Sequence, residues 1–196
     1  MEEGFGQQSE GNEHVYPWWL AYTFDNPLRT LLHRPECLFD GLVREGQTVM
    51  DIGCGMGHFS LGLARMVGEA GRVIAVDVQE GMLRRVRQRA ARAGLLDRIE
   101  LRQAGAEQMN IEERVDFVLA FWMVHEVPDK SAFFAEVKRL LKPEARLLMA
   151  EPKVHVTRVA FEGEVAQAGA AGLKLVAEPP VAASWAALFA LPDKTT

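Results

Sequence analysis

The chain has 196 residues, of which 48% are hydrophobic and 25% are charged, a composition ordinary for one globular domain with a sizeable core. Its net charge of −5 disfavours a nucleic-acid surface, its apolar runs are too short to cross a membrane, and its two cysteines are too few for a disulfide framework. We therefore expect a cytoplasmic protein, a monomer or a homodimer, that binds neither nucleic acid nor a membrane.

The sequence divides into an N-terminal segment, 1–45, and a larger region, 46–196. Two of the four tryptophans and both tyrosines fall between His14 and Pro27. This aromatic stretch is interpreted either as an arm packed on the main domain or as a lid over a substrate, and the two roles are compatible. The lid interpretation predicts three substrate contacts: Trp18, Trp19 and Tyr22.

Short apolar runs alternate with amphipathic helical patterns through the larger region. The runs predict strands at 49–52, 71–77, 99–104, 115–121 and 146–151. The patterns between and after them predict four helices. Two span 58–67 and 80–93, the third is capped by Ser131 and stopped by Pro143, and the fourth runs through Phe161 and Ala168.

Two further strands, 173–176 and 184–191, close the chain and are joined by only seven residues. So short a link, with no helix in it, indicates an antiparallel pair. The expected fold is α/β: a doubly wound, Rossmann-like, mostly parallel seven-stranded sheet with an antiparallel C-terminal hairpin. In such a sheet a ligand lies beyond the carboxyl ends of the strands, beside the first strand.

The stretch TVMDIGCGMGHF, which begins at Thr48, predicts a strand, a tight turn and the start of a helix. Glycines at alternate positions allow the turn and leave space for a ligand against the main chain, toward which the helix N-terminus aims free N–H groups. Asp77 ends the next strand, 20 residues after Gly57. A carboxylate at that spacing can accept hydrogen bonds from both hydroxyls of a ribose.

Two residues help to distinguish between nucleotides. The dinucleotide fingerprint G-x-G-x-x-G is not matched, because His58 stands where its third glycine would be. Asp51 would repel a pyrophosphate but favour a cationic amine or sulfonium. An adenosine that carries positive charge is S-adenosylmethionine (SAM), so we expect SAM rather than NAD, with S-adenosylhomocysteine as the product.

Three segments of the sequence resemble motifs of a known family. VMDIGCGMG resembles motif I of class I SAM-dependent methyltransferases, and VIAVD, ending at Asp77, resembles motif II. FWMVHEVPD, which begins at Phe121, resembles the segment after the fourth strand in the small-molecule branch. The most similar group is the small "type 11", or ubiquinone/menaquinone-biosynthesis-like, group. The resemblance covers about residues 45–191 and implies methyl transfer without a metal.

The resemblance also implies cofactor contacts. Gly53 and Gly55 would lie under the methionine moiety, and Phe121 and Trp122 would close over the sulfur. Many relatives carry an aspartate where this chain has Gly105, so Glu107 or a backbone carbonyl would have to replace it at the adenine. The full implied set is Asp51, Gly53, Gly55, Gly57, Asp77, Val78, Met82, Gly105, Ala106, Glu107, Phe121 and Trp122.

His125 and Glu126 follow the fourth strand and are the candidate catalytic residues. His125 would act as a general base if the acceptor's nucleophile carries a proton, and the alternative is that it orders its loop. His155, after the fifth strand, is a further candidate for contact with the acceptor. No metal site is expected, because these side chains lack the close spacing of metal ligands.

The sequence therefore predicts transfer of a methyl group from SAM to a small, partly apolar acceptor by in-line displacement. Two alternatives come from other classes. One is a SAM-binding module without catalysis. The other is an RNA or protein methyltransferase that uses the arginine-rich face of the predicted helix at 80–93.

Overall fold

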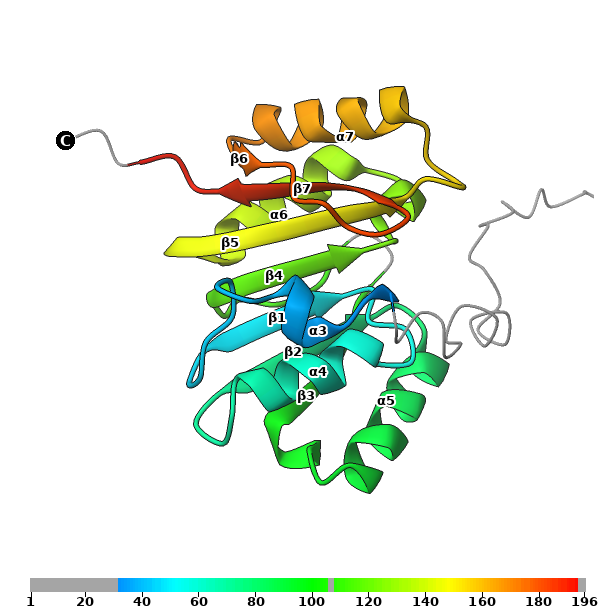
Figure 1. The fold of residues 1–196 in the computed structure, drawn as a ribbon, viewed down its shortest axis with the longest axis vertical. Coiled ribbons are helices and arrows are strands. Elements are labelled where there is room, and N and C mark those ends of the chain that lie inside the picture. Colours follow the sequence, from blue (N-terminus) through cyan, green and yellow to red (C-terminus); the bar gives the residue numbers. More distant parts are fainter. Residues whose placement is uncertain (1–31, 106–107, 194–196) are drawn as a thin grey trace, which may run out of the picture.

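A computed structural model describes residues 32–105 and 108–193. Within these ranges the chain forms a seven-stranded sheet flanked by helices (Figure 1). The strands are β1 (Thr48–Ile52), β2 (Arg72–Asp77), β3 (Ile99–Gln103), β4 (Val115–Phe121), β5 (Leu141–Pro152), β6 (Lys174–Ala177) and β7 (Ser184–Ala190). The helices are α3 (Pro35–Leu38), α4 (His58–Met66), α5 (Glu80–Arg92), α6 (Lys130–Leu140) and α7 (Arg158–Ala170), with short 3₁₀ turns η2 (Leu96–Arg98) and η3 (Val124–Glu126). The predicted contacts Trp18, Trp19, Tyr22, Ala106 and Glu107 lie outside the described residues.

The strand order is β3-β2-β1-β4-β5-β7-β6. β1 pairs in parallel with both β2 and β4, so the order of the sheet reverses beside β1. β7 is antiparallel to both β5 and β6, as the short link before it predicts. The doubly wound, Rossmann-like fold with its antiparallel C-terminal hairpin is therefore confirmed.

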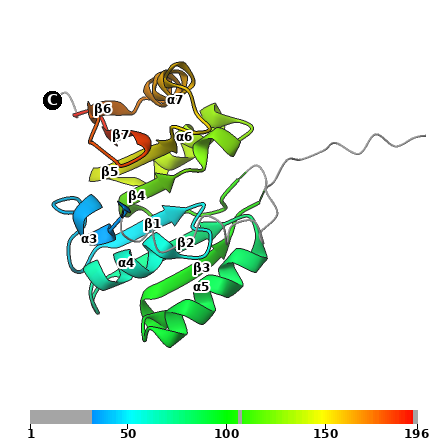
Figure 2. The same cartoon turned by 45° about the vertical axis from the view of Figure 1, so that its right-hand side comes forward.

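Two hydrophobic clusters cover the two faces of the sheet, because successive strand residues point to opposite sides. Val49 belongs to one cluster, with Phe59 of α4 and Val86 of α5, and Met50 belongs to the other, with Phe134 of α6. Figure 2 shows α4 and α5 beside β1–β3, and α6 and α7 beside β5–β7. The carboxyl end of β4 lies between these two pairs of helices.

The start of α6 and the start of β5 differ from the prediction. Asp129, not Ser131, caps α6, and its Oδ1 accepts a hydrogen bond from Ala132 N at 2.9 Å. The helix ends at Leu140, and β5 begins with the next residue rather than after Pro143. Pro143 falls where the pairing of β4 with β5 shifts register, and a residue without an N–H is tolerated at such an irregularity.

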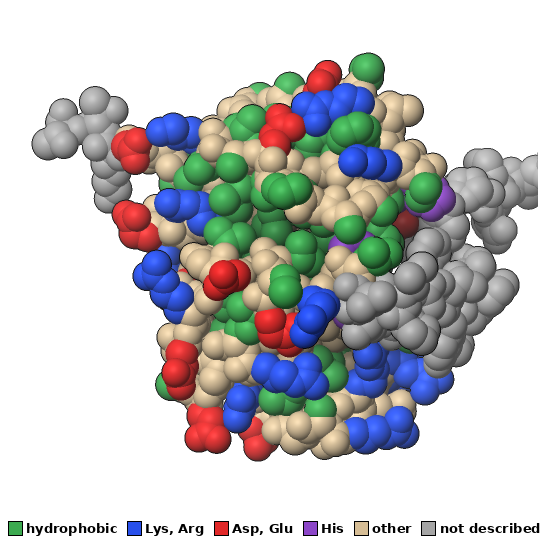
Figure 3. All heavy atoms as spheres, in the orientation of Figure 1, with side chains coloured by type: hydrophobic (Ala, Val, Ile, Leu, Met, Phe, Trp, Pro, Cys, Tyr) green, Lys and Arg blue, Asp and Glu red, His purple; other side chains and the backbone are tan. Residues whose placement is uncertain are grey.

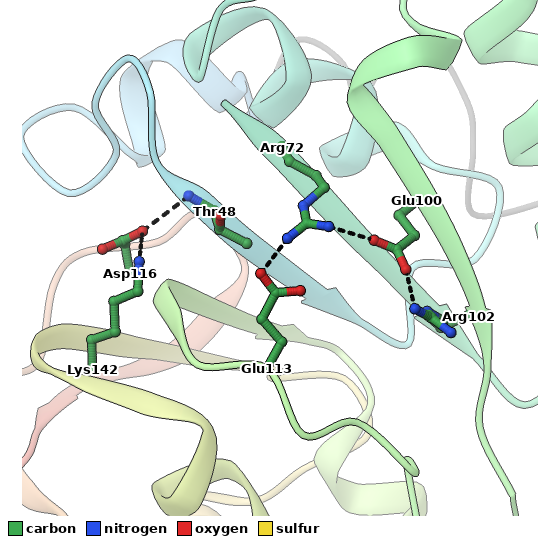
Figure 4. Close-up of polar contacts among 7 residues, drawn as sticks. All are labelled: Thr48, Arg72, Glu100, Arg102, Glu113, Asp116 and Lys142. Atoms are coloured by element: carbon green, nitrogen blue, oxygen red, sulfur yellow. Dashed lines mark hydrogen bonds and ion pairs between the residues drawn. The ribbon is translucent and has the colours of Figure 1, made fainter. Parts of the chain in front are cut away.

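Charged side chains pair with one another at the amino ends of the strands, away from the carboxyl ends where a ligand is expected (Figure 4). Arg72, at the start of β2, forms ion pairs with Glu100 at 2.9 Å and with Glu113. Asp116 of β4 accepts hydrogen bonds from Thr48 N at 3.0 Å and from Lys142 Nζ at 2.7 Å. These contacts involve five neighbouring strands, β3, β2, β1, β4 and β5, at the amino ends of the sheet.

Candidate functional site

The turn between β1 and α4 holds three glycines with positive φ: 66° at Gly53, 53° at Gly55 and 80° at Gly57. A Cβ on Gly53 would lie 2.8 Å from the Cβ of Met123, and one on Gly57 would lie 3.0 Å from Val86. A Cβ on Gly55 would meet no described atom within 4 Å. The first and third glycines therefore permit close packing, and Gly55 faces open space where a ligand can lie against the backbone.

Asp77 closes this open space from the end of β2. Its Oδ2 accepts a hydrogen bond from Gly55 N, and its Oδ1 accepts one from Gln79 N, both at 2.9 Å. Burial raises the pKa of Asp77, and these backbone hydrogen bonds oppose the rise. Each carboxylate oxygen keeps a lone pair for a further donor. The neighbouring Val78 is 47% exposed, so a ribose on Asp77 would place its base beside an apolar side chain.

The carboxylate of Asp51 lies beneath the same turn and is 2% exposed. Its Oδ2 accepts a hydrogen bond of 2.5 Å from Ser60 Oγ of α4. Burial, followed by the charges of Asp51 and Asp77, raises the pKa of the Cys54 thiol well above its ordinary range. Cys54 therefore stays a neutral side chain inside the turn, and the negative charge of the site resides on the two aspartates.

The loop after β3 accounts for the glycine at position 105. Gly105 N donates a hydrogen bond to Gln108 O at 2.9 Å, and a Cβ at position 105 would lie 3.2 Å from that oxygen. A side chain at position 105 would therefore crowd this carbonyl oxygen, which favours glycine there. Met82, predicted to flank the adenine, is 6% exposed on the inner side of α5.

The aromatic pair at the end of β4 has two different environments. Phe121 is 4% exposed and packs against Phe59, with ring centroids 4.5 Å apart. Trp122 is half-buried, its Nε1 donates to Ser184 Oγ at 2.8 Å, and its φ of 59° is left-handed. This conformation is costly for a bulky residue and turns the chain sharply out of β4. The next residue, Met123, then contacts Gly53.

His125 lies in η3, directly after this turn, and contacts a carboxylate of β5. Glu151 is fully buried, its Oε1 accepts a hydrogen bond from Val124 N at 2.8 Å, and its Oε2 is hydrogen-bonded to His125 Nδ1. Burial alone would lower the pKa of His125, but the hydrogen bond to Glu151 and the charges of Glu151, Glu126 and Glu164 outweigh it and raise the pKa. Because an ionised carboxylate only accepts, Nδ1 carries the hydrogen and Nε2 can take up a proton.

The other predicted polar residues gather around His125. Its Nε2 is 3.8 Å from Glu126 Oε1, and burial raises the pKa of Glu126. The ring of His155 stacks on that of His125, with centroids 6.4 Å apart and planes inclined by 16°. Across residues 32–105 and 108–193, no three His, Cys, Asp or Glu side chains are arranged to hold a metal ion.

Several site residues escape sequence reasoning. Ser60 has no motif that marks it, Met123 lies within the segment FWMVHEVPD but is not singled out there, and Arg89 falls on the arginine-rich face of the helix predicted at 80–93. In the structure Arg89 Nη1 donates to Met56 O at 2.8 Å and so anchors the glycine turn to α5. Glu164, a buried carboxyl on α7, also had no signal in the sequence, because helical periodicity favours apolar residues at such positions.

The glycine turn and Asp77 lie together at the carboxyl ends of β1 and β2, and the carboxylate of Asp51 is buried beside them. This fold and site define a SAM-dependent methyltransferase of class I. The chain belongs to the methyltransferase-domain family, whose model matches residues 44–178. The predicted enzyme class and cofactor are thereby confirmed.

Known relatives agree with this assignment. The ubiquinone/menaquinone biosynthesis C-methyltransferase UbiE of Escherichia coli is 34% identical over 110 residues, which cover 56% of this chain and 44% of that protein. The alignment thus spans less than half of that relative. The crystal structure of a SAM-dependent methyltransferase from Aquifex aeolicus superposes with a TM-score of 0.81 at 26% identity, over 91% of this chain and 100% of that one.

A more distant structure shares the fold alone. The ribosomal protein L11 methylase of Lactobacillus delbrueckii superposes with a TM-score of 0.69 at 14% identity, over 87% of this chain and 81% of that one. The fold therefore does not select the acceptor. No helix within the described ranges has both the length and the apolar character needed to cross a membrane.

Proposed function

We propose that this enzyme methylates a small-molecule acceptor whose attacking atom carries a proton, and that His125 removes that proton. The observation that carries the proposal is the His125–Glu151 pair at the carboxyl ends of β4 and β5. Met123, two residues before His125, contacts the glycine turn, so the pair is close to the proposed cofactor site. The name of the UbiE relative, a C-methyltransferase of ubiquinone and menaquinone biosynthesis, supports a small-molecule acceptor.

Each residue of the proposed site has a separate role. Asp77 binds the ribose hydroxyls, the backbone at Gly55 lies against the cofactor, and Asp51 favours its cationic end. SAM, when bound, supplies a methyl group on a sulfonium that a nucleophile can displace in line. His125 Nε2 accepts the proton of the acceptor, and Glu151 stabilises the imidazolium that results. The electron pair of the broken acceptor–hydrogen bond stays on the attacking atom.

The test is a methyl-transfer assay with labelled SAM across quinols, phenols, thiols, amines and metalloids. We expect turnover with an acceptor of the first two kinds. His125→Asn should lower kcat by about 10²- to 10⁴-fold, the usual contribution of a general base, and leave SAM affinity unchanged. His58→Asn, at a histidine whose ring bonds to the His33 carbonyl, is the matched control. Unchanged kcat in His125→Asn would refute the base role, and no turnover with any acceptor would favour a SAM-binding module.

A macromolecular acceptor is the second candidate, because Lys and Arg side chains gather toward the lower right of the surface, where α5 lies (Figure 3). Three of the α5 arginines already have partners in the protein, and one of them is Arg85, whose Nη1 donates to Gln88 Oε1 at 3.2 Å. Arg84 pairs with Glu80 at 2.9 Å, and Arg89 anchors the glycine turn. The double variant Arg84→Glu, Arg87→Glu reverses the charge on the exposed face of α5 and leaves Arg89 unchanged. Unchanged turnover of a small acceptor by this double variant, together with no binding of RNA by the parent enzyme, would exclude an RNA acceptor.

A further inference from the structure

Trp122 leaves β4 in a backbone conformation that its own side chain disfavours. Its φ of 59° is left-handed, a region that glycine adopts easily and that a residue with a bulky side chain adopts only at a cost. Such a conformation persists where the surrounding structure holds it. The groups around Trp122 must therefore fix both its backbone and its ring.

Groups from three separate segments contact Trp122. Its backbone N–H donates a hydrogen bond to Ala150 O of β5 at 2.7 Å, and its Nε1 donates to Ser184 Oγ of β7 at 2.8 Å. The ring of His33 meets the indole edge to face, with centroids 5.2 Å apart and planes inclined by 86°. Ser184 is 4% exposed and His33 is 1% exposed, so both partners of the indole are shielded from water.

The Ser184 hydroxyl is itself held in one orientation. It donates to Ala182 O at 3.1 Å, so its oxygen is left to accept the hydrogen bond from the indole. The same carbonyl oxygen accepts from His33 Nε2 at 2.8 Å. A carbonyl oxygen has two lone pairs, and these two donors use both of them. Ser184 therefore presents a lone pair to Trp122 in a fixed direction.

The position of Trp122 decides the course of the loop after β4. Met123, the next residue, lies so close to Gly53 that a Cβ on this glycine would be 2.8 Å from the Cβ of Met123. Two residues later in the chain, His125 is hydrogen-bonded through Nδ1 to Glu151. A change of Trp122 to the right-handed or extended backbone would turn the following residues away from the glycine turn.

We propose that Ser184 is a positioning residue for methyl transfer: its hydroxyl holds the Trp122 indole and thereby keeps Met123 against the glycine turn. This inference rests on the cofactor site proposed at that turn, and it is independent of the role of His125 as a base. Ser184 lies on β7, which β4 and β5 separate from β1, so it acts on the turn through Trp122. The closing hairpin thus supports the cofactor site from the far side of the sheet order.

The experiment compares SAM affinity, measured by calorimetry, in the full chain and two variants. Ser184→Ala removes the acceptor of the Trp122 indole. Trp185→Phe is the matched control, because Trp185 is the next residue on β7 and its Nε1 donates to Val156 O at 3.0 Å. Each variant therefore loses one indole hydrogen bond made from the same strand.

We expect SAM to bind about 2- to 10-fold more weakly to Ser184→Ala, the range that corresponds to one neutral hydrogen bond, and with parent affinity to Trp185→Phe. Parent affinity in folded Ser184→Ala overturns the proposal. An equal loss of affinity in Trp185→Phe also overturns it, because the effect would then follow from a weaker β7 and not from the hold on Trp122.

A second measurement uses the parent chain alone and so covers a Ser184→Ala variant that does not fold. NMR follows hydrogen exchange at the indole N–H groups with and without saturating SAM. Because coupling is reciprocal, SAM must stabilise the Trp122 contact by the factor by which that contact favours SAM. Exchange at Trp122 should slow by about 2- to 10-fold, with no change at Trp185.

An exchange rate at Trp122 that SAM leaves unchanged overturns the proposal. Neither measurement needs an acceptor or a proton transfer. Failure here therefore leaves the proposed base to the turnover of His125→Asn, and failure of that assay leaves the role of Ser184 intact.

Discussion

At the amino ends of the strands, Arg72 and Lys142 pair with carboxylates, and the side chains of both cations are 40% or more exposed. At the carboxyl ends, the carboxyls of Asp77 and Glu151 are buried and bonded to backbone N–H groups or to a histidine. The carboxyl of Glu164, on α7, is also buried, and its Oε2 has no hydrogen-bond partner among the described residues. Exposed pairs contribute little to stability, and buried carboxylates oppose it. The contrast indicates that the charged side chains at the amino ends of the strands (the amino edge) support the fold. Those at the carboxyl ends (the carboxyl edge) support the site and lower the stability of the fold.

The largest expected effect is on cofactor binding at the carboxyl edge. Asp77→Asn removes the charge that we propose for the ribose hydroxyls, and each hydrogen bond to a charged group contributes about 1.5–3 kcal/mol. SAM affinity should fall by roughly 100-fold or more, measured by calorimetry. Asp116→Asn, which removes a carboxylate at the amino edge, is the control and should leave SAM affinity unchanged. Equal affinities in the two variants would remove the distinction between the edges.

The next effect concerns the contact between the glycine turn and the loop after β4. In Gly53→Ala the methyl group meets Met123 at 2.8 Å with φ at 66°, so both strain and overpacking act. We expect a loss of roughly 2–4 kcal/mol in the free energy of unfolding, measured with urea. Gly41→Ala has a similar φ of 72° and no described atom within 4 Å, so it should lose only the backbone part, about 1–2 kcal/mol. A loss in Gly53→Ala no greater than in this control would mean that the loop moves away freely.

The third effect is a dependence of stability on pH. The pKa of Glu164 rises from 4.5 to about 7 on folding, so the unfolded chain releases this proton first as pH rises. The stability that Glu164 contributes in acid is therefore lost between these two values, by an amount on the order of 2–3 kcal/mol. His125, whose folded pKa is also raised, adds a loss in the same direction.

Urea unfolding at about pH 5.5 and about pH 8 measures this difference. Glu164→Gln should show a smaller fall in stability between the two conditions than the parent, and Glu162→Gln, at an exposed carboxyl of α7 that pairs with Arg158, should match the parent. If the stability of Glu164→Gln falls as steeply with pH as that of the parent, this carboxyl does not cause the loss of stability.

The smallest effect lies at the amino edge. Arg72→Gln breaks the ion pairs with Glu100 and Glu113, and exposed pairs of this kind contribute at most about 1 kcal/mol. The loss should shrink as salt is added, because salt screens exposed charges. Thermal unfolding at low and high salt checks both points. A large loss, or one that is independent of salt, would show that this edge is not simply an exposed network.

The fold could be predicted from the sequence because its signals are local. Apolar runs such as 72–76 indicate buried parallel strands, and the short link before Ser184 leaves an antiparallel return as the simple connection. The placement of Asp77 follows from its position at the end of a strand. His125 and Glu126, which follow the end of a strand, were selected as candidates for the same reason.

The remaining features depend on contacts distant in sequence. Periodicity on α7 assigns Phe161, Val165 and Ala168 to the core, whereas the structure buries Glu164 in place of Val165, which is only partly buried. A glutamate in an amphipathic pattern is assigned to solvent unless its neighbours are known. The contact of Met123 with Gly53 likewise requires the left-handed backbone of Trp122, which sequence preference disfavours.

The environment of Cys54 has a practical consequence. Thiol reagents attack the thiolate, and a buried thiol with a raised pKa offers almost none at neutral pH. Cys37 of α3 is exposed. Toward a maleimide the two-cysteine chain should therefore behave as though it had one cysteine. A fluorophore can be attached at α3 without mutagenesis, and its emission can follow events at the neighbouring α4.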